Sequence, residues 1–132
     1  MENQRVNTRE LREERFRKNP AAREKWERTA LARAVARAVA IAVIRYRAEH
    51  GLSQRALAKR LGMPQPHIAR LELGEHNPSV DMLPRLAQGL GQTFIVAVAP
   101  SERAEELVLP DGVQVLTDTR AADGSRVLAG SG

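Results

Sequence analysis

Residues 54–73 read QRALAKRLGMPQPHIARLEL, which is the pattern of two short helices joined by a tight turn. Two helices that cross steeply need a small residue at the crossing, a left-handed residue in the turn, and apolar residues that face inward from the second helix. Ala58 and Gly62 meet the first two needs. Ile68 and Leu71 meet the third. The spacing therefore predicts a helix-turn-helix unit.

Helical patterns continue on both sides of this unit. Before it, residues 21–49 contain neither Pro nor Gly and carry apolar residues at helical spacing, which predicts one long first helix. After it, residues 78–79 (Pro-Ser) are typical of a helix start. We expect Gly89 and Gly91 to end that helix.

The two ends of the chain have different patterns. Residues 1–19 alternate Arg and Glu, which predicts a frayed charged helix or a disordered arm. Residues 93–98 form a short β-prone run, and such a strand needs a partner. Within the chain, the candidates are residues 113–117 and 126–129, which flank a turn at 123–124. The same strand of a second copy is the alternative partner.

Charge and composition narrow the function. The 132 residues carry a formal net charge of +5, with 13 basic and 7 acidic side chains in residues 1–50 but 3 basic and 6 acidic ones in residues 100–132. A basic surface favours an acidic partner such as nucleic acid. Four aromatic residues are too few to read single strands by stacking, so we expect a duplex.

Several classes of protein are excluded by what the sequence lacks. Without cysteine, the chain has no disulfide, no zinc finger and no thiol nucleophile. Its charged beginning does not resemble a signal peptide, and its longest apolar run is too short for a membrane span. The three histidines lack metal-ligand spacing, and no phosphate-binding loop is present. We therefore expect a cytoplasmic bacterial protein that is not an enzyme and has no metal, cofactor or membrane partner.

Residues 52–91 resemble the Xre/Cro type of helix-turn-helix domain found in phage repressors and many bacterial regulators. More narrowly, the long Arg- and Ala-rich helix before this region and the stretch TFIVAVAP after it resemble the HigA-like antitoxins of type II toxin–antitoxin pairs. The specific match covers about residues 26–99. The resemblance implies a mainly α fold: a five-helix Xre/lambda-repressor-like helix-turn-helix domain with an extended N-terminal helix and one or more short C-terminal strands.

The resemblance also implies a DNA-binding surface. The helix that begins at Gln65 is similar to the family's recognition helix, and Gln and Arg side chains suit adenine and guanine in the major groove. Pro66 departs from the family pattern, since many phage repressors have a polar residue at this position. Because Pro66 cannot form a hydrogen bond through its side chain, we expect it to read DNA by shape or by contact with a thymine methyl. The expected DNA-binding residues are Gln54, Arg55, Lys59, Gln65, Pro66, His67, Arg70 and Asn77.

Structural roles compete with these assignments. Gln54 is also a common first-turn residue, and His67 can be a solvated polar residue. Arg55, Lys59 and Arg60 either grip phosphates or simply form an exposed charged face. For Asn77, a plain turn role is an equal alternative.

Two further segments are candidates for protein partners. Related antitoxins pair the strand after the DNA-binding core with its mate in a dimer, which makes Phe94, Ile95, Val96 and Val98 candidate dimer residues. The first forty residues are a candidate toxin-binding surface, or else they only lengthen the first helix for packing. Candidate toxin contacts are Arg23, Trp26, Arg28 and Leu31.

These inferences divide the chain into a charged N-terminal arm (1–20), a helix-turn-helix DNA-binding domain with a long first helix (21–92), and a C-terminal strand with an acidic tail (93–132). The predicted function is a homodimeric, nucleoid-associated repressor of a palindromic double-stranded operator, and the antitoxin of a small RelE/HigB-like toxin. The alternative is a stand-alone or prophage-type Xre regulator without a toxin. A small ribonuclease toxin is a remote third possibility.

Overall fold

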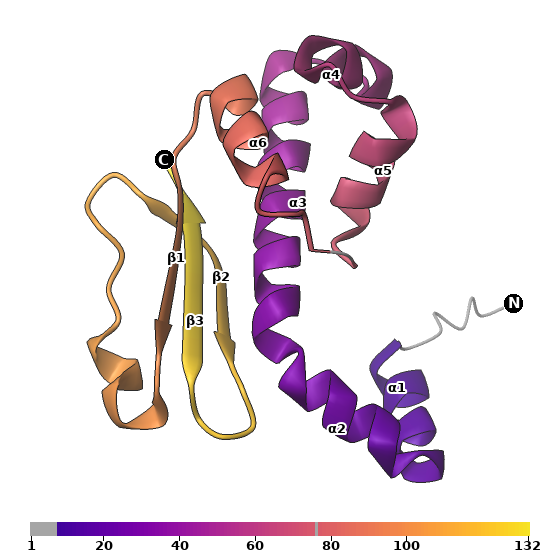
Figure 1. Cartoon of the computed structure of the whole chain (residues 1–132), viewed down its shortest axis with the longest axis vertical. Helices are drawn as coiled ribbons and strands as arrows, with labels where there is room; N and C mark the ends of the chain where they lie inside the picture. Colours follow the sequence, from indigo (N-terminus) through magenta and orange to yellow (C-terminus); the bar gives the residue numbers. More distant parts are fainter. Residues whose placement is uncertain (1–7, 76) are drawn as a thin grey trace, which may run out of the picture.

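A computed structural model describes residues 8–75 and 77–132, without the side chains of Thr8, Arg9, Glu27, Arg28 and Leu31. Helices occupy the first two thirds of the chain, and a small sheet occupies the rest (Figure 1). In chain order the elements are α1 (Thr8–Lys18), α2 (Pro20–Arg28), α3 (Ala30–His50), α4 (Gln54–Leu61), α5 (Gln65–Leu73), α6 (Met82–Leu90), β1 (Phe94–Ala99), the 3₁₀ turn η1 (Ser101–Glu106), β2 (Gln114–Arg120) and β3 (Arg126–Ser131).

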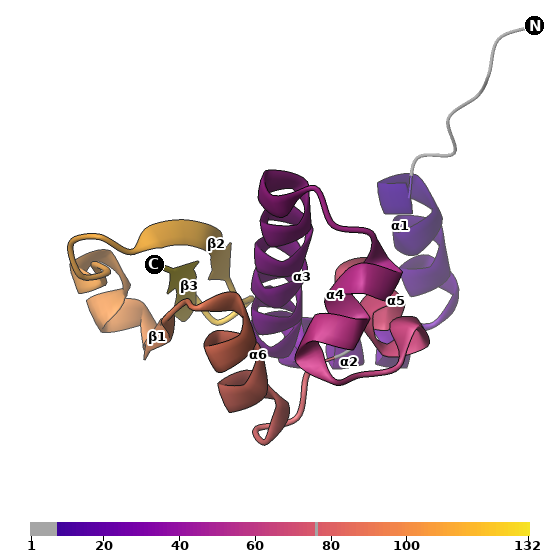
Figure 2. The same ribbon diagram turned by 90° about the horizontal axis from the view of Figure 1, so that it is seen from above.

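Helix α3 is the central element of the fold. Figure 2 shows it between α4 and α5 on one side and the sheet on the other. Its Val43 is fully buried in a core shared with α4, α5 and α6, where Leu57, Ile68 and Leu86 are also fully buried. Towards the sheet, Thr117 Oγ1 donates a hydrogen bond to the Ala34 carbonyl (3.1 Å). Because α3 is buried on two sides, its apolar residues cover much of its circumference.

The sheet is antiparallel, with strand order β1-β3-β2. Strand β1 pairs with β3 in the same chain, with Val96 opposite Ala129 and Val98 opposite Val127. Both strands predicted in the tail are thus confirmed, and the tail supplies the partner of β1. The β2–β3 turn contains Gly124 at φ +88°, a conformation that glycine adopts without steric cost.

The prediction of one long helix over residues 21–49 is wrong at one position, because the helix breaks at Thr29 into α2 and α3. The Thr29 hydroxyl donates to the carbonyls of Lys25 (2.9 Å) and Trp26 (3.2 Å). A β-branched hydroxyl residue that bonds back to the preceding turn bends a helix. Figure 1 shows α2 turning away from the axis of α3 at this point.

The N-terminal arm contains a regular helix. Helix α1 folds back on α2, and the buried Phe16 packs against Trp26 with ring centroids 6.1 Å apart.

The prediction for the end of α6 also needs correction. Gly89 lies inside α6, and only Gly91, at φ +64°, closes it.

Candidate nucleic-acid interface

The helix-turn-helix unit is built as its spacing predicts. Ser53 caps α4 by accepting a hydrogen bond from the Ala56 N–H at 3.0 Å. Gly62 closes α4 at φ +68°, the left-handed conformation that a steep turn needs. Ala58 is buried, and Ile68 and Leu71 hold the inner face of α5. Pro66 lies in the first turn of α5, where its missing N–H leaves no hydrogen bond unmade.

A chain of polar contacts runs from the centre of the molecule to the first residue of α5. The Arg47 guanidinium forms a bidentate ion pair with the Glu72 carboxylate, and its Nη2 lies 3.1 Å from Glu72 Oε2. Gln54 Nε2 donates to the same oxygen at 2.6 Å. Gln54 Oε1 then accepts from Gln65 Nε2 at 3.0 Å. The network sets the orientation of the two glutamines that the sequence assigns to DNA.

Arg47 and Glu72 were not among the predicted site residues. The Glu72 side chain is only 8% exposed, and its hydrogen bond raises the pKa of Arg47. Their positions in sequence, 25 residues apart on two helices, show no local pattern that pairs them. A charged residue next to the buried stripe of α5 is the one signal that points to such a partner.

Three other predicted residues gather around one hollow. His67 and Arg70 of α5 and Asn77 of the following loop line a depression of about 350 Å³ together with Ser79. Arg70 and Asn77 are exposed, and His67 is half-buried. Polar side chains that rim a hollow beside an exposed helix face are suited to contact base edges and phosphates.

The predicted phosphate contacts lie on α4. Arg55 and Lys59 are both exposed, and neither forms an ion pair with any of the described residues. Their neighbour Arg60 instead donates to the Tyr46 hydroxyl at 3.1 Å. The charges of Arg55 and Lys59 are therefore available to an anionic partner.

The candidate partner residues lie away from this surface. In β1, Phe94 and Ile95 are half-buried, whereas Val96 and Val98 are 45% and 60% exposed. Trp26 is half-buried between α1 and α2, and Arg23 is exposed on α2. The side chains of Arg28 and Leu31 lie outside the described part of the chain.

Comparison with known proteins agrees with this architecture. Residues 43–95 match the family model for the helix-turn-helix domain. The chain is 40% identical over 58 residues to the uncharacterized HTH-type transcriptional regulator y4dJ of Sinorhizobium fredii, across 44% of this chain and 75% of that protein. The chain belongs to the helix-turn-helix family of transcriptional regulators.

Further members of the helix-turn-helix family support this placement. An uncharacterized HTH-type transcriptional regulator of Methanothermobacter thermautotrophicus is 40% identical over 50 residues, across 38% of this chain and 72% of that protein. An uncharacterized HTH-type transcriptional regulator of Haemophilus influenzae is 39% identical over 54 residues, across 41% of this chain and 55% of that protein. No solved structure matches the chain significantly.

Two further observations concern the described residues of this helix-turn-helix protein. None of its described helices is both long and apolar enough to cross a membrane. Within the same residues, no three metal-ligating side chains are grouped to hold a metal ion.

Proposed function

We propose that this regulator is a sequence-specific repressor that reads duplex DNA with α5. The observation that carries the proposal is the network from Arg47 to Gln65. Because Gln54 Nε2 is held by Glu72, its Oε1 faces Gln65 and takes one of that residue's two N–H groups. Gln65 keeps its Oε1 and a second N–H, which is the pair of groups that binds adenine bidentately in the major groove.

The remaining residues of the surface divide by role. Arg70 and His67 are proposed to contact base edges, and Pro66 to contact a thymine methyl. Arg55, Lys59 and Asn77 are proposed to hold phosphates, as exposed groups beside the reading helix. Such a protein works on the nucleoid in the bacterial cytoplasm.

The test is selection of a preferred duplex from a random pool, followed by titration with variants. Gln65→Ala and Arg70→Ala should each cost about 1 to 3 kcal/mol on the selected duplex and little on random duplex. Arg103→Ala, in η1 on the far side of the sheet, is the control and should leave both affinities unchanged. A chain that binds every duplex equally at all salt concentrations would contradict the proposal.

Strand β1 supports a homodimer as the form that binds a palindromic operator. Thr93 and Gly132 exchange both of their backbone hydrogen bonds (2.8 and 3.1 Å). Since bonded pairs alternate along antiparallel strands, the backbone groups of Phe94, Val96 and Val98 point away from β3. A second copy of β1 can meet this free edge around a two-fold axis at Val96, which would join two sheets into one of six strands.

The groove beside this edge adds apolar surface. A hollow of about 310 Å³ lies between α3, α6 and β1, and Val80 at its rim is 82% exposed. An uncharged, apolar edge strand without Pro or Lys has none of the features that prevent pairing. The lining residues are Val35, Ala38, Val39, Val80, Leu83, Pro84, Ala87, Phe94, Val96, Ala129 and Gly130.

A charge at the proposed axis tests the dimer. Val96→Lys should give a monomer in analytical ultracentrifugation and weaken operator binding, because the two half-sites become uncoupled. Val108→Lys introduces the same charge at a residue that is 82% exposed and lies outside β1, so it should remain dimeric. A Val96→Lys chain that sediments as a dimer and binds its operator tightly would show that β1 is not the interface.

The N-terminal hairpin of α1 and α2 is the proposed site for a RelE/HigB-like toxin encoded beside this regulator. The hairpin extends beyond the core formed by α3 to α6 (Figure 1). Its exposed Leu11 lies beside a hollow of about 520 Å³ that Trp26 also lines, and a protein partner can cover such an apolar surface. Arg23, Trp26, Arg28 and Leu31 remain the proposed contacts.

Copurification separates the antitoxin from a stand-alone regulator. The full chain should capture the neighbouring gene product and rescue cells that express it, whereas a chain starting at Ala30 should do neither. A neighbour that is not toxic would favour the stand-alone regulator.

A further inference from the structure

A basic cleft opens between the N-terminal hairpin and the end of the recognition helix. It has a volume of about 630 Å³, and its walls come from α1, α2, α3, the end of α5 and β2. Three arginines from two helices contribute to it: Arg12 from α1, and Arg33 and Arg37 from α3. We call this site the arginine cleft.

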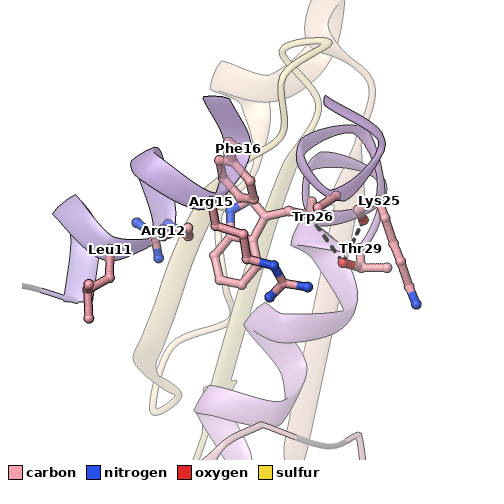
Figure 3. Close-up of a pocket in the computed structure, with 8 residues that line it drawn as sticks. Leu11, Arg12, Arg15, Phe16, Lys25, Trp26 and Thr29 are labelled. Atoms are coloured by element: carbon pink, nitrogen blue, oxygen red, sulfur yellow. Dashed lines mark hydrogen bonds between the residues drawn. The ribbon is translucent and has the colours of Figure 1, made fainter. Parts of the chain in front are cut away.

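The arginine cleft is arranged around Trp26. The guanidinium carbon of Arg33 lies 3.2 Å from the centroid of the indole ring, and that of Arg12 lies 4.6 Å from it. Arg33 Nη1 also donates to the Trp26 carbonyl (2.5 Å) and to Thr29 Oγ1 (2.7 Å). Figure 3 shows Trp26 with Arg12 and Phe16 where α1 and α2 meet. Through these hydrogen bonds, the helix break at Thr29 fixes the position of the Arg33 guanidinium group.

The arginine charges are not neutralised by the described part of the chain. Arg12, Arg33 and Arg37 form no ion pair with any described carboxylate. The carboxylate that lines the cleft, Glu75, is exposed and is not paired with them. Burial and the charges of Arg12 and Arg37 lower the pKa of Arg33. An anion in the cleft would relieve this repulsion, and planar guanidinium groups are suited to bind phosphate oxygens.

The arginine cleft adjoins the proposed DNA surface. Leu73 and Gly74, the last residue of α5 and its cap, form one wall. Arg70 and Asn77, which precede and follow these residues in the chain, line the hollow described above. The reading face of α5, the loop after it and the cleft thus follow one another along the chain's surface.

We propose that the arginine cleft binds backbone phosphates of duplex DNA that flank the half-site read by α5. The inference rests on the DNA-binding function proposed above and extends its footprint to α1 and α3. Polyanionic DNA is the occupant that the observations favour, because three arginines that form no ion pair with a described carboxylate lie next to the reading helix. Phosphate contacts of this kind add affinity and orientation without sequence preference.

The test uses the full chain and a random-sequence duplex of about 30 base pairs, long enough to extend past one half-site. The double variant Arg12→Gln/Arg37→Gln removes two positive charges from the cleft. It keeps Arg33, because the hydrogen bond from Arg33 to the Trp26 carbonyl is part of the local structure. Arg17→Gln/Arg103→Gln changes the net charge equally at two exposed arginines outside the cleft. For the cleft variant, the slope of log affinity against log salt should become shallower by about 2 per bound protomer, which is about 4 for the proposed dimer, and binding should be at least about tenfold weaker at moderate salt. The control should bind like the wild type.

Trp26, the only tryptophan, reports on the cleft directly. Without DNA, iodide should quench its fluorescence more than caesium does, and the cleft variant should lose this preference. Bound duplex should protect Trp26 from the neutral quencher acrylamide. The inference is overturned if the cleft variant keeps the wild-type slope of log affinity against log salt and acrylamide still reaches Trp26 in the complex. That result would leave the DNA-binding proposal intact. If the wild type binds no duplex, both this inference and the DNA-binding proposal fail.

Discussion

At the scale of single residues, Glu72 connects the core to the proposed DNA-reading surface. Its carboxylate accepts from Arg47 on one side and from Gln54 on the other, so it serves both stability and orientation. Because it leaves Arg47 without its anionic partner, Glu72→Ala should lower the free energy of unfolding by about 2 to 3 kcal/mol. Urea denaturation measures this change.

Glu72→Gln separates the two roles of this residue. The amide keeps an oxygen for one donor but loses the charge, so the loss of stability should be smaller while operator selectivity still falls. If both variants unfold within about 0.5 kcal/mol of the wild type, the ion pair adds nothing to stability.

Asp118 gives the sheet a dependence on pH. Arg126 donates to its two carboxylate oxygens at 2.8 Å each, and these hydrogen bonds lower the pKa of Asp118 below 3.8. The stabilisation is present above the unfolded pKa of about 3.8 and is lost as pH falls through the lower folded value. Asp118→Asn should therefore unfold more easily at pH 6 but approach the wild type near pH 2. If the melting temperatures of the wild type and Asp118→Asn differ by the same amount at every pH, the prediction is wrong.

At the scale of elements, α4 and α6 approach closely at Gly89. A Cβ atom added there would lie 2.0 Å from Leu61 Cδ2, so a larger residue forces the Leu61 side chain to move. Ala favours helices by about 1 kcal/mol over Gly, which offsets part of this overpacking cost of about 1 to 3 kcal/mol. Gly89→Ala should thus destabilise by about 1 kcal/mol in urea denaturation. Gln88→Ala, exposed on the same helix, is the control and should be neutral or slightly stabilising.

At the scale of the whole molecule, α3 depends on the sheet more than on the N-terminal hairpin. Thr117 bonds to Ala34, and β2 and β3 bury one side of α3. The hairpin packs mainly on itself through Phe16 and Trp26. A chain starting at Ala30 should therefore unfold within a few degrees of the full chain, whereas a chain ending at Gln92 should unfold at least about 10 °C lower. Circular dichroism melts compare them, and equal loss in both would contradict this division.

The helix-turn-helix unit was predictable from the sequence because its requirements are local. A left-handed turn needs Gly62, a close crossing needs Ala58, and a cap needs Ser53, all within ten residues. The strands of the tail were predictable for the same reason, since a β-prone run and a turn residue lie next to each other. The residues proposed to face DNA follow once α5 is taken as the recognition helix.

Tertiary structure decided what depends on contacts between distant residues. Arg47 and Glu72 meet across 25 positions, and Gly89 is glycine because Leu61 of another helix lies against it. The Thr29 hydroxyl selects the bend between α2 and α3, although the composition around it favours an unbroken helix. The arginine cleft depends on two tertiary features: the α1–α2 hairpin, which brings Arg12 to Trp26, and this bend, across which Arg33 reaches the same ring. Sequence patterns report the period of one element, whereas ion pairs, close approaches and clefts depend on how elements pack.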